Sequence, residues 1–377
     1  MSRNVEYPNF LHLERLTDGT GLLEHALGRI PRRREGYTTD DNARALWACL
    51  AWLEIIGNDP SAAASRMRLL RLTETYAAFL LWAQEEDGSF HNNFYYDRTP
   101  EPEQASDDCL GRALWAAACA CSHAGLSLAA EQLLLRGLPH IESITAARGW
   151  AYALSACSLL IRSERQGRLP GISASLREQI RCRCTAYMAE LESRLLQLFE
   201  ENARPDWNWL EPVMTYGNGV LPWSLLQAFA TTGNTRSLET GLALLDFLAE
   251  RMTAPSPQGW IRPIGNRGWC TPDDRAIWDQ QPLDVMKLAL AAEQAYAVKE
   301  RQEHLALIAA CRDWFHGRND AGASLADPKD GSCCDGLTAS GRNDNCGAES
   351  TLSYLLTEAI YARTFGGEGL NERNRLP

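Results

Sequence analysis

The sequence predicts an all-α fold, a single-domain (α/α)6 toroid in which six helical hairpins form an inner and an outer ring. Three observations support this class. Strand signals, such as sustained alternation of apolar and polar residues, are nearly absent. Helical signals recur about a dozen times along the 377 residues. The helical segments also alternate between two kinds, one apolar almost all round and one with a single apolar stripe.

The segments that are apolar all round supply the predicted inner ring. A helix with apolar residues on every side must be buried on every side, as the inner helices of a double ring are. These segments cover residues 43–56, 110–121, 150–161, 221–230, 283–297 and 352–362.

The striped segments supply the predicted outer ring. In residues 235–252, Leu238, Leu242 and Leu245 share one face, while charged residues lie off it. Similar segments cover residues 61–82, 127–138, 172–201 and 302–315. We expect the stretch 17–27 to form the sixth outer helix and close the ring; an open solenoid of hairpins is the alternative. Because no linker composition divides the chain, residues 1–377 are predicted to form one domain.

Composition excludes several classes of partner and cofactor. The net charge of −11 offers no basic footprint for nucleic acid. No segment reaches the roughly 18 uninterrupted apolar residues of a membrane span, and the first residues lack the apolar core of a signal peptide. The twelve cysteines are scattered without a C-x-x-C spacing, so we expect reduced core thiols in a cytoplasmic protein. Histidine spacing and glycine patterns predict neither a metal nor a cofactor.

The toroid topology predicts where function lies. Every inner helix runs the same way in a hairpin ring, so the inner-helix N-termini gather at one rim. The segments that lead into those helices are the most polar and aromatic-rich of the chain. They cover residues 36–44, 103–112, 144–150, 206–218, 265–282 and 342–350.

This rim carries candidates for glycosidic-bond chemistry, which requires one protonated carboxyl group and one ionised carboxylate. Glu211 follows the string DWNWL in a loop where no helix end requires it, so we predict it as the general acid. Glu349, or one of Asp41 and Asp108, is the predicted base. An inverting enzyme is preferred, with carboxyl groups about 6.5–9.5 Å apart; a separation near 5 Å would favour retention.

The rim also offers flat indoles and forked polar groups, which suit sugar rings and hydroxyls. The predicted binding residues are Asp40, Asn42, Trp150, Trp207, Trp209, Tyr216, Asn218, Arg267, Trp269, Asp279 and Gln280.

Structural roles are the alternative for many of these residues. Asp40, Asp41, Asp107 and Asp108 occupy N-cap and first-turn positions, where acids stabilise a helix. Asp279 stands in a similar place ahead of the helix that begins near residue 282. The tryptophans could plug the barrel mouth instead of stacking on a sugar.

Several strings resemble a bacterial family of six-hairpin glycosidase-like proteins. These strings are GYTTDDNARAL (36–46), SDDCLGRALWA (106–116), DWNWLE with TYGN (206–218), PIGNRGW (263–269), DQQP (279–282) and GAESTLSYLL (347–356). The resemblance implies the toroid and a carbohydrate context. Members of that family are often encoded beside, or fused to, glycosyltransferases, which implies an association with such enzymes.

Three functions therefore remain open. The first is a glycoside hydrolase that acts on an oligosaccharide or on a polysaccharide end. The second is a non-catalytic glycan-binding or scaffold protein of a polysaccharide system, which carboxylates fully engaged in caps or arginine pairs would favour. The third is a sugar epimerase or isomerase on the same fold, which two facing rim histidines would favour.

Overall fold

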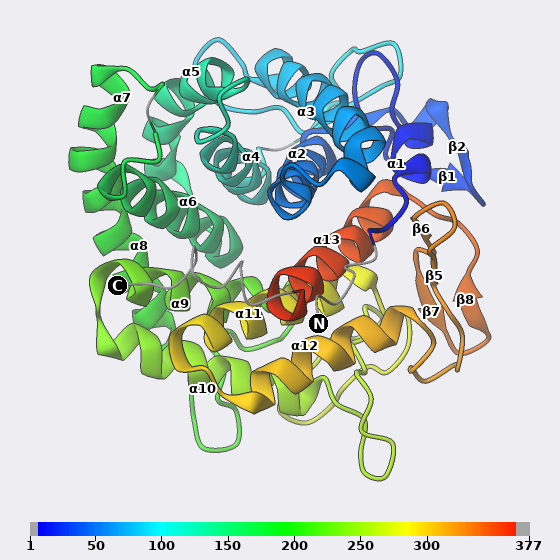
Figure 1. Ribbon diagram of the computed structural model, residues 1–377. Coiled ribbons are helices and arrows are strands. Elements are labelled where there is room, and N and C mark those ends of the chain that lie inside the picture. The colour runs from blue at the N-terminus through cyan, green and yellow to red at the C-terminus, as the bar shows by residue number, and fades with distance from the viewer. Residues whose placement is uncertain (1–6, 104, 170, 367–377) are drawn as a thin grey trace.

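The computed structural model describes residues 7–103, 105–169 and 171–366 and shows a closed double ring of helices (Figure 1). Each inner helix packs against the next, and the last packs against the first, so the ring is closed and the open solenoid is excluded. The inner helices are α2 (Thr39–Ile56), α4 (Asp107–Ala120), α6 (Ala147–Arg165), α9 (Val220–Thr232), α11 (Pro282–Lys299) and α13 (Ala348–Phe365).

The outer helices cover the joints of the inner ring. Five predicted outer segments are helical, and the third is a composite whose middle is a π-helical turn. They are α3 (Ala63–Ala83), α5 (Ser127–Gly137), α7 (Ala174–Gln179) continued by a π turn (Ile180–Cys184) and α8 (Thr185–Asn202), α10 (Thr235–Arg251), and α12 (Gln302–Phe315).

The prediction of a sixth outer helix at residues 17–27 is wrong. The short helix α1 (Leu11–Leu16) fills that position and packs against α13. The following stretch is extended, with antiparallel bridges that join Thr17 to Leu22 and Leu23 to Tyr37. At Gly21 a Cβ atom would come within 2.6 Å of the Asn42 side chain, so the backbone lies directly on α2. This stretch therefore runs to the rim rather than along the outer ring.

The connections between the helices contain short strands and 3-10 turns. In the described part of the chain the strands form four antiparallel two-stranded ladders, β1–β2, β3–β4, β5–β6 and β7–β8. Their bounds are β1 (Ala26–Leu27), β2 (Ile30–Pro31), β3 (Tyr37–Thr38), β4 (Asn93–Phe94), β5 (Ala326–Asp327), β6 (Ser332–Cys333), β7 (Gly336–Thr338) and β8 (Gly341–Asn343). The 3-10 turns are η1 (Arg33–Glu35), η2 (Pro60–Ala62) and η3 (Leu138–Ser143).

An aromatic plug fills the middle of the inner ring. Trp47 of α2, Trp115 of α4 and Trp223 of α9 are buried and in mutual ring contact, with centroids 4.7–6.4 Å apart. The amino group of Lys287 lies 5.1 Å from the Trp47 ring and 4.8 Å from the Tyr152 ring, in cation–π geometry. Because Tyr152 belongs to α6 and Lys287 to α11, five of the six inner helices contribute side chains at the axis. These packed side chains, which we call the plug, separate the two ends of the barrel.

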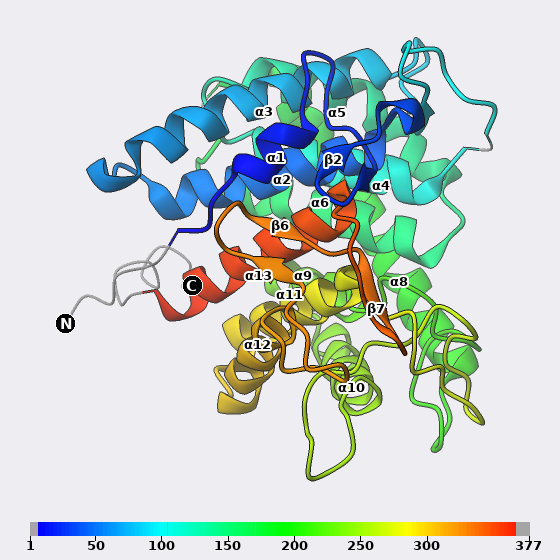
Figure 2. The same ribbon diagram turned by 90° about the vertical axis from the view of Figure 1, so that its right-hand side faces the viewer.

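Figure 2 shows the two ends in side view. Helices α2 and α13 run the same way, so their N-terminal ends share one side of the molecule and their C-terminal ends share the other. None of the helices in the described part of the chain has the length and apolar character needed to cross a bilayer. The cysteines are free thiols and most are buried.

Candidate functional site

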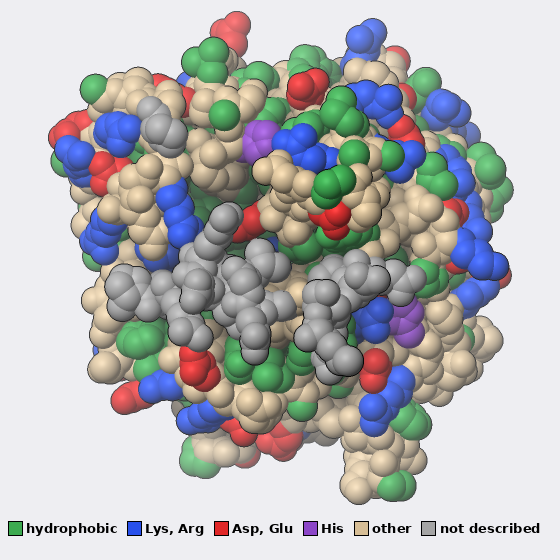
Figure 3. Space-filling view, viewed as in Figure 1, with side chains coloured by type: hydrophobic (Ala, Val, Ile, Leu, Met, Phe, Trp, Pro, Cys, Tyr) green, Lys and Arg blue, Asp and Glu red, His purple; other side chains and the backbone are tan. Residues whose placement is uncertain are grey.

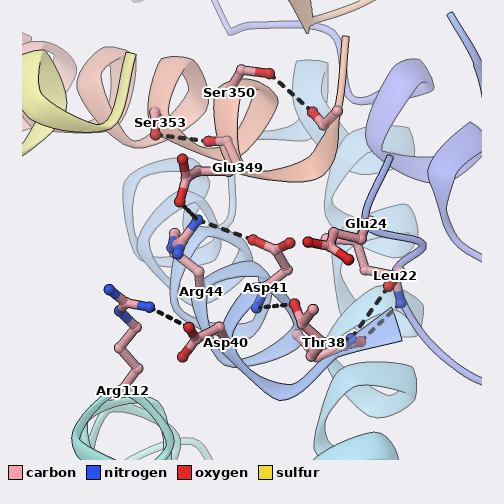
Figure 4. Close-up of polar contacts among 12 residues, drawn as sticks. Leu22, Glu24, Thr38, Asp40, Asp41, Arg44, Arg112, Glu349, Ser350 and Ser353 are labelled. Atoms are coloured by element: carbon pink, nitrogen blue, oxygen red, sulfur yellow. Dashed lines mark hydrogen bonds and ion pairs between the residues drawn. The ribbon is translucent and has the colours of Figure 1, made fainter. Parts of the chain in front are cut away.

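The guanidinium of Arg44, in α2, contacts two carboxylates, that of Asp41 in the same helix and that of Glu349 in α13. Thr38 caps the helix, since its hydroxyl accepts a hydrogen bond from the Asp41 N–H at 3.2 Å. Arg44, one turn further on, donates from Nη1 to Asp41 Oδ1 at 3.0 Å and contacts Glu349 Oε2, at the start of α13, at 3.2 Å. Arg44 and Asp41 are buried, whereas the Glu349 side chain is 41% exposed. Glu349 therefore forms the open edge of this group (Figure 4).

A third carboxyl group, that of Glu24, joins this cluster and was not predicted. Its backbone carbonyl accepts from the Ala348 N–H at 2.9 Å, which ties the 17–27 stretch to α13. In Figure 4 the Asp41 carboxylate stands between those of Glu349 and Glu24. Burial, together with the negative charge of Asp41, raises the pKa of Glu24 to about 8. Sequence reasoning missed Glu24 because the stretch reads as an amphipathic helix.

Burial also perturbs the ionisation of Asp41. Loss of solvent raises its pKa to about 6, even though the adjacent Arg44 favours the charged form. We call Glu24, Asp41, Arg44 and Glu349 the acid cluster. It contains carboxyl groups with different protonation tendencies within one small volume, which is the usual signature of acid–base sites.

A second guanidinium joins α2 to α4. Arg112 donates to Asp40 and, at 3.0 Å, to Asp108 Oδ2. The Tyr216 hydroxyl donates to the same Asp108 oxygen at 3.0 Å. Burial and the Asp108 charge raise the pKa of Tyr216 to about 12, so it remains a hydrogen-bond donor. The structure thus brings Asp40, Asp108 and Tyr216 together, as predicted from their shared rim.

Glu211 and Arg148 form a third arginine–carboxylate pair at the rim. Arg148 of α6 donates from Nη1 to Glu211 Oε1 at 2.9 Å and from Nη2 to Oε2 at 3.1 Å. The same guanidinium reaches Asn218 Oδ1 at 3.2 Å and lies 4.9 Å from the Tyr216 ring centre. A bidentate guanidinium pair suits an ionised carboxylate. The role of Glu211 as the general acid stays a prediction, and the structure places its carboxylate in this two-point contact with Arg148.

Asp284 is a further buried carboxyl group that sequence reasoning missed. Its Oδ1 accepts from the Gly217 N–H at 2.7 Å, which fixes the loop before α9 against α11. Burial raises its pKa to about 7. The available signal was an acid in the first turn of a helix whose first half is mostly apolar.

Several predicted binding residues are part of the scaffold. Asn42 is buried and exchanges hydrogen bonds with the Leu22 backbone. Gln280 is buried and donates to Asp320 Oδ2 at 2.7 Å. Trp207 and Trp209 have no exposed surface, so neither presents a ring face to a ligand. The expectation of sugar stacking on these two indoles is therefore corrected: both are buried, and Trp207 donates to the Glu211 carbonyl and contacts the Phe247 ring.

The remaining predicted residues lie in other parts of the rim. Trp150 is half-buried, donates to the Ile144 carbonyl and lies beneath the Arg194 guanidinium at 5.2 Å. Arg267, which is 85% exposed, pairs with Asp279 at 2.9 Å in the loop before α11. Trp269 is partly buried in that same loop. Among the described residues, no hydrogen bond or ion pair links these side chains to the acid cluster.

Asp107 has a structural role, but not as the cap of its own helix, because Ser106 caps α4. Oδ2 of Asp107 accepts from the Thr145 and Ala146 N–H groups at 2.8 and 2.7 Å, just ahead of α6. Within the described ranges, no group of three or more His, Cys, Asp and Glu side chains has metal-binding geometry.

Comparison with solved structures identifies the fold. Cellobiose 2-epimerase from Bacillus thermoamylovorans B4167 superposes with a TM-score of 0.67 at 11% identity, over 93% of this chain and 96% of that one. The GH76 α-mannanase BT2949 of Bacteroides thetaiotaomicron gives 0.62 at 10% identity, over 93% and 92%. The cellulase Cel9M of C. cellulolyticum gives 0.57 at 9% identity, over 92% and 88%.

These similar structures are six-hairpin glycosidase-like enzymes, so the predicted (α/α)6 fold class is confirmed. No protein-family model and no curated protein matches the sequence. At such low identity the likeness concerns the fold alone.

Proposed function

We propose that this protein is a glycoside hydrolase that acts on an oligosaccharide or a polysaccharide end, with the acid cluster as its catalytic centre. One observation carries the proposal. A carboxyl group whose pKa is raised to about 8 and an exposed carboxylate flank the same buried Asp41–Arg44 pair. Glycosidic cleavage requires this combination of a proton donor and an ionised partner.

Glu24 is the proposed proton donor. With a pKa of about 8 it holds its proton at neutral pH, and the neighbouring Asp41 charge reinforces that state. About a third of its side chain is exposed, so a glycosidic oxygen can approach it. Glu211, the donor predicted from the sequence, instead orients Arg148, Asn218 and the loop before α9.

Glu349 is the proposed base that activates water. Its exposure allows water to reach it, and Arg44 stabilises its charge. Asp41 and Glu349 contact the same nitrogen of Arg44 at 3.0 and 3.2 Å, so they lie closer than the roughly 6.5 Å minimum of an inverting pair. Glu24 stands beyond Asp41 (Figure 4), so the Glu24–Glu349 pair is the more widely separated of the two pairs. Inversion is therefore the proposed outcome for the Glu24–Glu349 pair.

The test is a comparison of Glu24→Gln and Glu349→Gln with the unchanged protein. Release of reducing ends is followed on manno-, gluco- and galacto-oligosaccharides, and NMR identifies the first-formed anomer. Each variant should lose about 10²–10⁴-fold in kcat, as expected for removal of an acid or base. Activity of the unchanged protein should fall as the pH rises through about 8, because Glu24 then loses its proton.

Glu190→Gln is the matched control, since that side chain is exposed on α8 and pairs, among the described residues, only with its helix neighbour Arg194. Full activity in both Glu24→Gln and Glu349→Gln would overturn the assignment. A retained anomeric configuration would overturn inversion alone.

A non-catalytic glycan-binding role is the second candidate. It is favoured by the arginine pairs that engage Asp40, Asp41, Asp108, Glu211 and Glu349. Calorimetric binding of an oligosaccharide without cleavage in the same panel would support this role.

A sugar epimerase is the third candidate. The fold is shared with cellobiose 2-epimerase, and His25 Nε2 lies 3.4 Å from Glu24 Oε1 at the rim. Such an enzyme would convert a free sugar to its epimer without creating a new reducing end, which chromatography of the products distinguishes from hydrolysis.

A further inference from the structure

A hollow lies at the opposite end of the barrel from the acid cluster. Its volume is about 740 Å³, within the range of small-molecule sites. Residues from the C-terminal halves of all six inner helices line it, from Leu53 of α2 round to Arg363 of α13. Figure 3 looks onto this face of the molecule. We call this hollow the rear cavity.

The aromatic plug forms the floor of the rear cavity. Trp47, Trp115 and Trp223 line it, although each keeps less than a tenth of its surface exposed. The indoles therefore offer edges and small patches of apolar surface at the base. Such a floor suits the C–H groups of a sugar ring.

A belt of planar polar groups forms the wall. Arg162 of α6 donates to the Gln227 side chain of α9, which in turn donates to Gln294 Oε1 of α11 at 2.9 Å. Beside them, Arg363 of α13 forms two 2.9 Å hydrogen bonds with Glu293. Guanidinium, amide and carboxylate groups that already restrain one another are suited to vicinal hydroxyls, because little side-chain entropy remains to be lost.

Two arginines on this wall, Arg66 and Arg162, have no carboxylate partner among the described residues, although the whole chain carries a net charge of −11. Loss of solvent and the nearby Arg168 lower the pKa of Arg162 to about 10. Arg162 also donates to the Gln227 carbonyl at 3.2 Å, so the end of α9 explains part of its placement. Arg66 has no such role, because it lies in the first turn of α3, where a cation is not favoured.

We propose that the rear cavity binds a pyranose ring that carries an anionic substituent, a carboxylate or a phosphate, at a site separate from the acid cluster. The sugar ring would lie on the indole floor with its hydroxyls against the Arg162–Gln227–Gln294 belt. The anionic group would meet Arg66 and Arg162. This proposal does not depend on the proposed hydrolase activity, because the plug separates the two ends of the barrel.

Isothermal titration calorimetry of the full chain tests the proposal with four probes: D-glucuronate, D-glucose 6-phosphate, D-glucose and inorganic phosphate. At least one of the two anionic sugars should bind saturably, at least tenfold more tightly than glucose and than phosphate alone. Which of the two binds more tightly identifies the anionic group. Equal affinity for glucose, equal affinity for inorganic phosphate, or no binding by either anionic sugar would overturn the proposal.

Two variants locate the site. Arg66→Met should weaken binding of the anionic sugar at least tenfold, while Glu349→Gln at the rim should leave it unchanged. Arg342→Met is the matched control, because that half-exposed arginine lies outside the cavity and pairs with Asp344. An unaffected Arg66→Met, or loss of binding in Glu349→Gln, would show that the ligand binds elsewhere and would overturn the assignment.

Discussion

Arg44 shows how single residues hold the rim together. Its guanidinium is 3% exposed and serves both Asp41 and Glu349. Removal of one partner from a buried pair leaves an uncompensated charge, which typically costs about 3–5 kcal/mol. We expect Arg44→Met to lower the free energy of unfolding by roughly that amount, as measured by urea denaturation. Arg204→Met, the control, removes an exposed ion pair with Asp206 and should change the free energy of unfolding by less than about 1 kcal/mol. An equal loss of stability in the Arg44 and Arg204 variants would contradict this account.

Asp284 couples folding to pH. Its pKa is about 7 in the folded protein and near 3.9 in the unfolded chain, so the native state binds the proton more tightly. The resulting stabilisation is full below about pH 4 and is lost as the pH rises through about 7. Asp284→Asn mimics the protonated form and can still accept from the Gly217 N–H.

The stability of the unchanged protein relative to Asp284→Asn should therefore decrease between pH 5 and pH 8, as measured by urea titration at each pH. Asp344→Asn, at a side chain that is 83% exposed, is the control and should show no such trend. If the difference in stability between the unchanged protein and Asp284→Asn stays constant with pH, the raised pKa of Asp284 is contradicted.

At the scale of elements, two glycines set the distance between α4 and α6. A Cβ on Gly111 would lie 2.8 Å from the Tyr152 Cβ, and one on Gly149 would lie 2.8 Å from the Asp107 Cβ. Both glycines have ordinary helical backbone, so alanine would be favoured locally. Overpacking should outweigh that preference and cost about 1–3 kcal/mol.

Gly149→Ala should accordingly lower the midpoint of thermal unfolding. Gly19→Ala is its control, because nothing lies within 4 Å of a Cβ at that loop position. An increase in stability for Gly149→Ala would show that the helices can separate without cost.

The elements themselves were largely predictable, because apolar periodicity depends on local sequence. Each predicted inner helix coincides with an observed one, although α2 begins at Thr39 rather than at residue 43. That first turn is polar, so a pattern based on apolar residues excludes it. The 17–27 stretch was mispredicted because its leucines are buried by the extended chain lying on α2, a tertiary effect that local periodicity does not carry.

Which residues lie at the rim was predictable from the topology, but the arginine–carboxylate pairs that they form were not. Parallel inner helices required Asp40, Asp41, Asp108 and Glu349 to share one end. Which arginine meets which carboxylate depends on contacts such as Arg148 to Glu211, 63 residues apart in sequence. For the same reason the burial of the DWNWL indoles and the role of Glu24 emerged only from the three-dimensional structure.

At the scale of the whole molecule, closure of the ring joins distant parts of the chain. The Trp52 indole N–H of α2 donates to the Leu355 carbonyl of α13 at 2.9 Å, across 303 positions in sequence. Trp52→Phe removes this bond and should cost about 1 kcal/mol. Circular dichroism and tryptophan fluorescence should still report the same transition midpoint for this variant, because the two helices belong to one cooperative ring. Separate midpoints would show that α13 unfolds independently.

The packed indoles at the axis also restrict how a long polymer could be handled. Trp47, Trp115 and Trp223 are buried in contact with one another at the axis, where they form the floor of the rear cavity. A glycan strand therefore cannot be threaded through the toroid and drawn along it. Under the proposed hydrolase activity, such a strand would approach the side that carries the acid cluster with one chain end or lie across that side, and the products would leave from the same side.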